Sequence, residues 1–162
     1  MDMSGFGKSV AFAATVMLAG TTLASAQANH FRGNACIQTA TAACGPVGVS
    51  VGGCYDARLR PANFNGQPNS TKLSLFAGMW AMNFTLPVGT LVGAAFKPVK
   101  ASAIGQSLSQ YNASARIPAM APAAPAPATI FVNATIDINA FDVDAPTCNV
   151  RLRFQGQRFP LP

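Results

Sequence analysis

The acidic side chains are few, and only those near the C-terminus are spaced so that they could act together. The chain has five aspartates and no glutamate. Asp142 and Asp144 are the close pair, preceded by Asp137 and Asn139. Paired carboxylates can cleave a glycosidic bond, and the oxygen atoms of this cluster could bind Ca²⁺. The order lacks the glycine and the terminal glutamate of an EF-hand loop, and Asp and Asn are common in turns. We therefore predict a polar turn and no metal site.

Nucleophilic catalysis requires a base held within hydrogen-bond reach of the nucleophile. His30 is the only histidine, and it lies in a polar N-terminal stretch over 27–35 that we expect to be mobile. The sequence thus offers no catalytic residue and no cofactor motif, and we predict a protein that is not an enzyme.

The cysteines are even in number and contain no CxxC pair. They occur at Cys36, Cys44, Cys54 and Cys148. With one histidine in the chain, this spacing does not fit zinc, whereas an even count in an oxidising compartment predicts two disulfides. Three connectivities are possible, and all of them give Cys148 a long-range link.

Basic residues outnumber acidic ones, with a formal net charge of +6. Two pairs of arginines fall on the polar faces of predicted strands: Arg58 with Arg60, and Arg151 with Arg153. They would form a basic stripe if the two strands were neighbours, which makes them weak candidates for binding an anionic surface polymer. The alternative is that they are ordinary solvent-facing arginines. Nucleic acid is disfavoured because few aromatic residues interleave with these cations.

The first 26 residues have the order of a secretory signal peptide. Lys8 supplies a positive charge, residues 9–23 are uncharged and mostly apolar, and Ala24 and Ala26 are small residues at the cleavage site. A membrane anchor or a buried helix is the alternative, but Gly20 and the threonines after it interrupt the apolar stretch. We predict cleavage near Ala26 and a secreted or periplasmic protein.

The remaining chain alternates short apolar-polar runs with loops rich in Pro, Gly and Asn. Strands are predicted over 47–51, 54–60, 72–76, 79–86, 90–99, 129–141 and 149–155. The stretch 101–111 is undecided between strand and helix, and the Pro/Ala-rich tract 117–128 is predicted to be an extended loop or spacer. We therefore predict a single all-β domain over 36–162, a small antiparallel β-sandwich or Greek-key-like barrel of about seven strands.

The two clearest runs should pair as a hairpin with their apolar faces in one core, because the link between them is short. Those faces comprise Ile130, Val132, Ala134, Ile136 and Ile138 in the first run, and Val150, Leu152 and Phe154 in the second. Trp80, Met79, Met82 and Phe84 could form a binding patch, but we expect a core cluster.

These features predict an extracytoplasmic structural or interaction module that is not an enzyme. The alternative is an extracytoplasmic module that binds an anionic ligand or glycan. The partner would be another extracytoplasmic protein or an anionic surface polymer.

Overall fold

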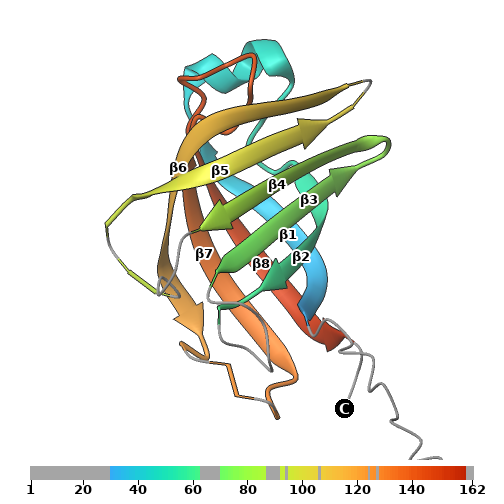
Figure 1. The fold of residues 1–162 in the computed structure, drawn as a ribbon, viewed down its shortest axis with the longest axis vertical. Helices are drawn as coiled ribbons and strands as arrows, with labels where there is room; N and C mark the ends of the chain where they lie inside the picture. Colours follow the sequence, from blue (N-terminus) through green and yellow to red (C-terminus); the bar gives the residue numbers. More distant parts are fainter. Residues whose placement is uncertain are drawn as a thin grey trace, which may run out of the picture.

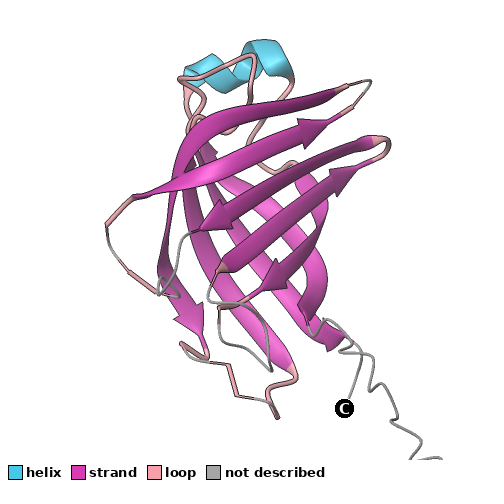
Figure 2. Cartoon of the chain, in the orientation of Figure 1, coloured by secondary structure: helices cyan, strands magenta, loops and turns pink. Residues whose placement is uncertain are grey.

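The computed structural model of the chain describes residues 30–62, 70–86, 92–93, 95–105, 107–123, 125–126 and 128–159. The predicted signal peptide over 1–26 lies outside these residues. Eight strands and one short 3₁₀ helix, η1, make up the fold (Figures 1 and 2), and their bounds are β1 His30–Ala40, η1 Ala42–Val47, β2 Cys54–Arg60, β3 Thr71–Ala77, β4 Trp80–Leu86, β5 Lys97–Ile104, β6 Leu108–Ala121, β7 Phe131–Asn139 and β8 Val150–Phe159. No helix in this described part is long and apolar enough to cross a membrane.

Each strand pairs antiparallel with the next one in sequence, and β8 pairs with β1 to close the sheet into a barrel. The prediction of a small antiparallel all-β domain is confirmed, with eight strands where about seven were expected. The consecutive strand order is that of an up-and-down barrel rather than a sandwich or Greek key. Closure gives every strand two partners, so no sheet edge is left unpaired.

The barrel interior is apolar and packed, because alternate residues of each strand point inward. The predicted hairpin forms: β7 pairs with β8, and Ile136 lies opposite Leu152 with both side chains fully buried. The prediction was wrong for Ile130, which precedes β7 and is exposed. Phe141, in the link between the two strands, is buried and stacks on Phe84 at a ring distance of 5.8 Å.

Both predicted disulfides are present in the structure. Cys36 of β1 bonds to Cys54, its direct partner on β2. Cys44 of η1 bonds to Cys148 in the link between β7 and β8, 104 residues away in sequence. The second bond fastens η1 to the chain that leads into β8, at the same end of the barrel as Phe141.

Two corrections concern the N-terminal part. Residues 30–35 were expected to be mobile but belong to β1, which is hydrogen-bonded on both sides, to β2 and to β8. The strand predicted over 47–51 is absent. Val47 instead ends η1, which contains Pro46 and is bonded to Cys148 through Cys44. Gly48 then ends the helix in the left-handed conformation, with φ 76°.

Further corrections concern the middle of the chain. β5 begins at Lys97, later than the run predicted over 90–99, and the undecided stretch 101–111 contains the end of β5, a turn and the start of β6. The Pro/Ala-rich tract is partly strand, since β6 runs to Ala121. A register shift between Arg116 and Ala119 lets β6 pass Pro118, which has no N–H to donate.

The expected core cluster around Trp80 was also wrong in part. Phe84 is fully buried, but Trp80 is 59% exposed and Met79 is 91% exposed. The turn between β3 and β4 lies at Gly78 and Met79, and Trp80 is the first residue of β4. Met79 and Trp80 therefore lie at the end of the barrel and not in its core.

Candidate functional site

The outward side chains of β2 to β6 form two polar rows that cross all five strands. Cross-strand pairing aligns one row as Arg58, Ser74, Asn83, Ser102 and Gln110, and the other as Arg60, Lys72, Thr85, Lys100 and Asn112. We call these ten residues the basic face. Their inward neighbours, such as Leu73 and Phe84, are buried in the core, so the alternation of each strand holds the polar side chains outward. With strands about 4.8 Å apart, each row is about 19 Å long.

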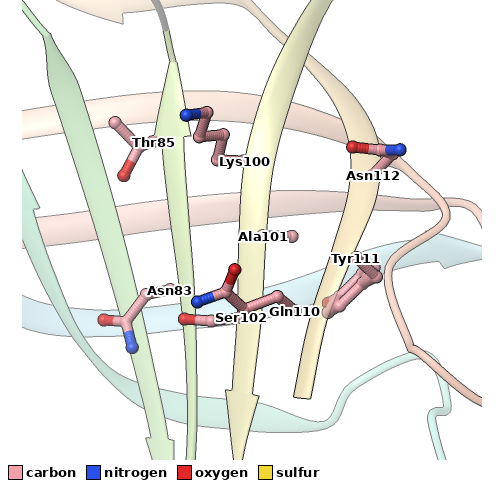
Figure 3. Close-up of a pocket in the computed structure, with 8 residues that line it drawn as sticks. All are labelled: Asn83, Thr85, Lys100, Ala101, Ser102, Gln110, Tyr111 and Asn112. Carbon is pink, nitrogen blue, oxygen red and sulfur yellow. The ribbon is translucent and has the colours of Figure 1, made fainter. Parts of the chain in front are cut away.

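Two shallow hollows lie along the basic face. One of about 380 Å³ spans β4 to β6, and one of about 320 Å³ spans β2 to β4. Asn83 lines both, so the two hollows lie next to each other on β4. Figure 3 shows Asn83, Ser102 and Gln110 together on three neighbouring strands, with Thr85 and Lys100 side by side further along. An open polar groove of this kind fits an extended ligand lying on the surface better than an enclosed small molecule.

Two contacts hold side chains of the face in place. The Ser74 hydroxyl donates a hydrogen bond to Oδ1 of Asn83 at 2.7 Å. The Arg58 guanidinium lies over the ring of Phe76, 5.3 Å from its centroid. A cation–π contact leaves the N–H groups at the edge of the guanidinium plane able to donate to a ligand.

The charge on the face is of one sign. The two rows contain four cations, Arg58, Arg60, Lys72 and Lys100, and no carboxylate. The nearest acidic position along β2 is Asp56, which is paired with Phe76 outside the rows. A groove lined by one sign of charge attracts ligands of the opposite sign.

Asp137, the first candidate carboxylate, lies on the outer side of β7 between two arginines. Its oxygens accept hydrogen bonds from Nε of Arg116 at 2.7 Å and from Nε of Arg151 at 2.6 Å. The Arg151 hydrogen bond is the largest cause of a lowered pKa for Asp137; burial opposes it, and the Arg116 hydrogen bond adds to the lowering. Phe96 lies beneath the Arg116 guanidinium, 4.6 Å away. This carboxylate is therefore ionised and fully engaged, which suits a structural clamp.

Asp142 and Asp144 lie in the turn after β7, as predicted. Oδ1 of Asp142 accepts a hydrogen bond from the backbone N–H of Asp144 at 2.9 Å, the side-chain contact typical of an Asx turn. Burial, and after it the charge of Asp142, raises the pKa of Tyr55 and of Tyr111 above the ordinary value. The hydroxyl group of Tyr111 donates a hydrogen bond to the backbone carbonyl oxygen of Phe141 at 2.7 Å. Among the described residues, no group of three or more His, Cys, Asp or Glu side chains is placed to hold a metal ion.

The four arginines singled out from the sequence do not form one stripe, because β1 lies between β2 and β8. Arg58 is opposite Arg32 of β1, whereas Arg153 is opposite Cys36. The pairs are therefore offset along the strands. Arg58 and Arg60 join the basic face, and Arg151 is bound to Asp137.

Sequence reasoning missed Lys72, Lys100 and the amide side chains of the face. Lys72 is the one lysine of β3, and Lys100 shares β5 only with Lys97, so neither produced a charge cluster. The available signal was alternation: Lys72 and Ser74 alternate with buried leucines, and Lys100 and Ser102 with buried alanines. Only the pairing of β3, β4 and β5 brings these residues together.

His30 is the first residue of β1 and is largely buried, with its ring 5.5 Å from that of Phe159. It lies at the end of a strand that neighbours β8, away from the turn that holds Asp142. The structure therefore does not bring the histidine to the acidic pair.

Comparisons with protein-family models, curated proteins and solved structures find no match to this chain. The chemistry of the basic face is thus the basis for a functional proposal.

Proposed function

We propose that this protein is a non-enzymatic binding module that captures an anionic ligand on the basic face. The observation that carries the proposal is the alignment of four cations from β2, β3 and β5 in two neighbouring outward rows that contain no carboxylate. This narrows the general expectation of a structural or interaction module to one class of partner, an anionic surface polymer or glycan.

The polar side chains between the cations support a ligand with many oxygen atoms. Asn83, Gln110 and Asn112 carry amide groups that donate and accept hydrogen bonds, and the hydroxyls of Ser74, Thr85 and Ser102 do both as well. Sulfate, phosphate or carboxylate groups on a polymer would bind the cations, while hydroxyls of the same polymer bind the amides. The two rows extend about 19 Å across five strands, which suits a chain rather than a compact molecule.

The state of the carboxylates supports a role without catalysis. General acid–base chemistry uses a carboxyl group with an accessible proton and a tuned pKa. Asp137 is held ionised by two arginines and Asp142 caps its own turn. Neither faces the groove on which the ligand would lie.

The proposal places the protein outside the cytoplasm, as a secreted or periplasmic protein released by cleavage near Ala26. The two disulfides are consistent with an oxidising compartment. Anionic polysaccharides and other charged surface polymers are present in that setting, so ligand class and location agree.

Binding of fluorescently labelled heparin, a sulfated polysaccharide, tests the proposal. In low salt the protein should raise the anisotropy of the probe, and added salt should weaken the complex because the cations are exposed. Removing two cations in Lys72→Gln/Lys100→Gln should weaken binding about tenfold or more, since hydrogen bonds to charged groups contribute about 1.5–3 kcal/mol each.

Arg153→Gln is the matched control, because Arg153 is an exposed cation on β8 outside the basic face. It should change heparin affinity less than about threefold, the effect of one distant charge. Since the control removes one charge, it is compared with Lys72→Gln and Lys100→Gln singly; an equal loss in all three would show attraction to net charge alone, and would contradict a specific face.

A further inference from the structure

An apolar rim adjoins the basic face at the tips of two hairpins. Met79 and Trp80 lie in and after the turn between β3 and β4, and Ile104 and Leu108 flank the turn between β5 and β6. The exposed fractions are 91% for Met79, 62% for Leu108, 59% for Trp80 and 43% for Ile104. We call these four residues the apolar rim. Figure 1 shows both hairpin tips extending toward the same side of the barrel.

The two tips are in contact through Trp80 and Gly105. A Cβ atom built on Gly105 would lie 2.5 Å from Cζ3 of the Trp80 ring. The indole therefore lies against the backbone at Gly105, and a larger residue at this position would require the ring to move. Between the tips, Ala81 pairs with Ile104, and Ile104 pairs with Leu108. Ile104 and Leu108 lie on the outer face of the sheet, whereas Trp80 has the inward phase of Phe84 and lies at the end of the barrel. The contact with Gly105 thus brings the two tips together, and the rim joins residues of both sides of the sheet at these tips.

Two residues of the rim, Ile104 and Leu108, continue the outward rows of the basic face along β5 and β6. On β5, Ile104 follows the outward residues Ser102 and Lys100 at intervals of two residues. Along β5, the row that contains Ser102 lies about 7 Å from Ile104, and the row that contains Lys100 lies about 13 Å from it. Asp56 lies at the β2 end of the same cross-strand row as Ile104 and Leu108, about 19 Å from Leu108.

This order of chemistry is that of a protein surface resting on a lipid bilayer. Apolar side chains enter about 5–10 Å into the boundary between headgroups and acyl chains. Tryptophan prefers the interface itself, and lysine and arginine reach the phosphate groups, each raising affinity for an anionic membrane about fivefold.

We propose that the protein docks on an anionic lipid surface, with the apolar rim inserted at the headgroup level and the cations of the basic face bound to lipid phosphates. This inference rests on the anion binding of the proposed function and goes beyond it, because it adds a lipid headgroup layer to the anionic ligands of the same face. Trp80 would move from water into the interface on binding.

The fluorescence of Trp80 tests this directly, since it is the only tryptophan in the chain. The protein is titrated with vesicles of phosphatidylcholine containing about one third phosphatidylglycerol, and separately with phosphatidylcholine alone. With the anionic vesicles, the emission of Trp80 should shift to the blue and the protein should co-sediment. With the neutral vesicles, neither effect should occur. No blue shift with anionic vesicles would overturn the proposal.

Leu108→Ser should reduce partitioning into anionic vesicles about fivefold or more by removing one inserted side chain. Phe131→Ser is the control, because Phe131 is 63% exposed but lies on β7, outside the rim; it should leave partitioning within about twofold. Equal effects of the two variants would overturn the docking geometry. Heparin binding without vesicle binding would refute lipid docking and leave the proposed function standing, whereas loss of both would refute both.

Discussion

Asp137 of β7 lies directly opposite Arg151 of β8 in the barrel, and the two side chains form an ion pair at 2.6 Å. Arg116 of β6 binds the other carboxylate oxygen at 2.7 Å. One carboxylate thus links three consecutive strands on the outer side of the sheet. Its own side chain is only 8% exposed, while those of Arg116 and Arg151 are 29% and 43% exposed.

Asp137→Asn should destabilise the barrel by about 1–3 kcal/mol, because two arginines lose their counter-charge. The pKa of Asp137 is lowered in the folded protein, so its contribution to stability is complete above the unfolded value of 3.8 and is lost as the pH falls toward the lower folded value. Urea unfolding at neutral pH and near pH 3 measures both effects. If the wild type and the variant lost equal stability on acidification, protonation of Asp137 would not be the cause of that loss.

The two disulfides should differ in their contributions to stability. In the chain-entropy model, the bond between Cys44 and Cys148, 104 residues apart, stabilises by about 1.5 kcal/mol more than the bond between Cys36 and Cys54, 18 residues apart. Urea unfolding of the two double-serine variants gives the comparison. Thiol labelling of the unreduced wild type should find no free cysteine; labelling of two or more would refute the pairing.

Burial in the hairpin of β7 and β8 predicts opposite outcomes for two substitutions. Ile136→Asp places a charge in the core where the native side chain is fully buried, and should cost about 3–5 kcal/mol or prevent folding. Arg153→Ser, on the exposed side, should cost about 0.5 kcal/mol or less. Thermal melts that found the two variants equally stable would contradict the inward direction of Ile136.

If residues 1–26 are a signal peptide, the protein outside the cytoplasm should lack them. Mass spectrometry of the secreted or periplasmic fraction should find an N-terminus near Gln27, since Ala24 and Ala26 have the small side chains that signal peptidases require. The unprocessed chain in the cytoplasmic fraction of the same cells is the comparison. Recovery of only that form would refute the predicted signal peptide.

The strands that were predicted well are those in which large apolar residues alternate with charged ones. β2 and the first part of β8 matched because Leu59 and Leu152 alternate with arginines. β1 was missed because its inward positions include the small residues Gly33 and Ala35. Gly33 faces Gly156 across the β1–β8 pair, where a side chain would collide with the backbone of β8. Closure of the barrel depends on this pairing between the two ends of the chain, which local periodicity does not encode.

The candidate site was less accessible to sequence reasoning than the fold. Arg58 and Arg60 were identified because they share one strand, but the two lysines of the basic face, Lys72 and Lys100, come from separate strands, β3 and β5. Their alignment depends on the registers of β3 with β4 and of β4 with β5. A stripe between β2 and β8 was expected because the order of strands around a closed barrel was unknown, and β1 separates the two.

The side-chain amide groups provide the most direct measurement of ligand position. Nuclear magnetic resonance resolves the NH₂ signals of Asn83, Gln110 and Asn112 on the basic face, and those of Asn133 and Gln155 on β7 and β8 as an internal reference. On titration with a short heparin oligosaccharide, the three signals of the basic face should shift together and saturate while the reference signals stay in place. Shifts confined to Asn133 and Gln155, or spread evenly over both groups, would contradict a binding site on the basic face.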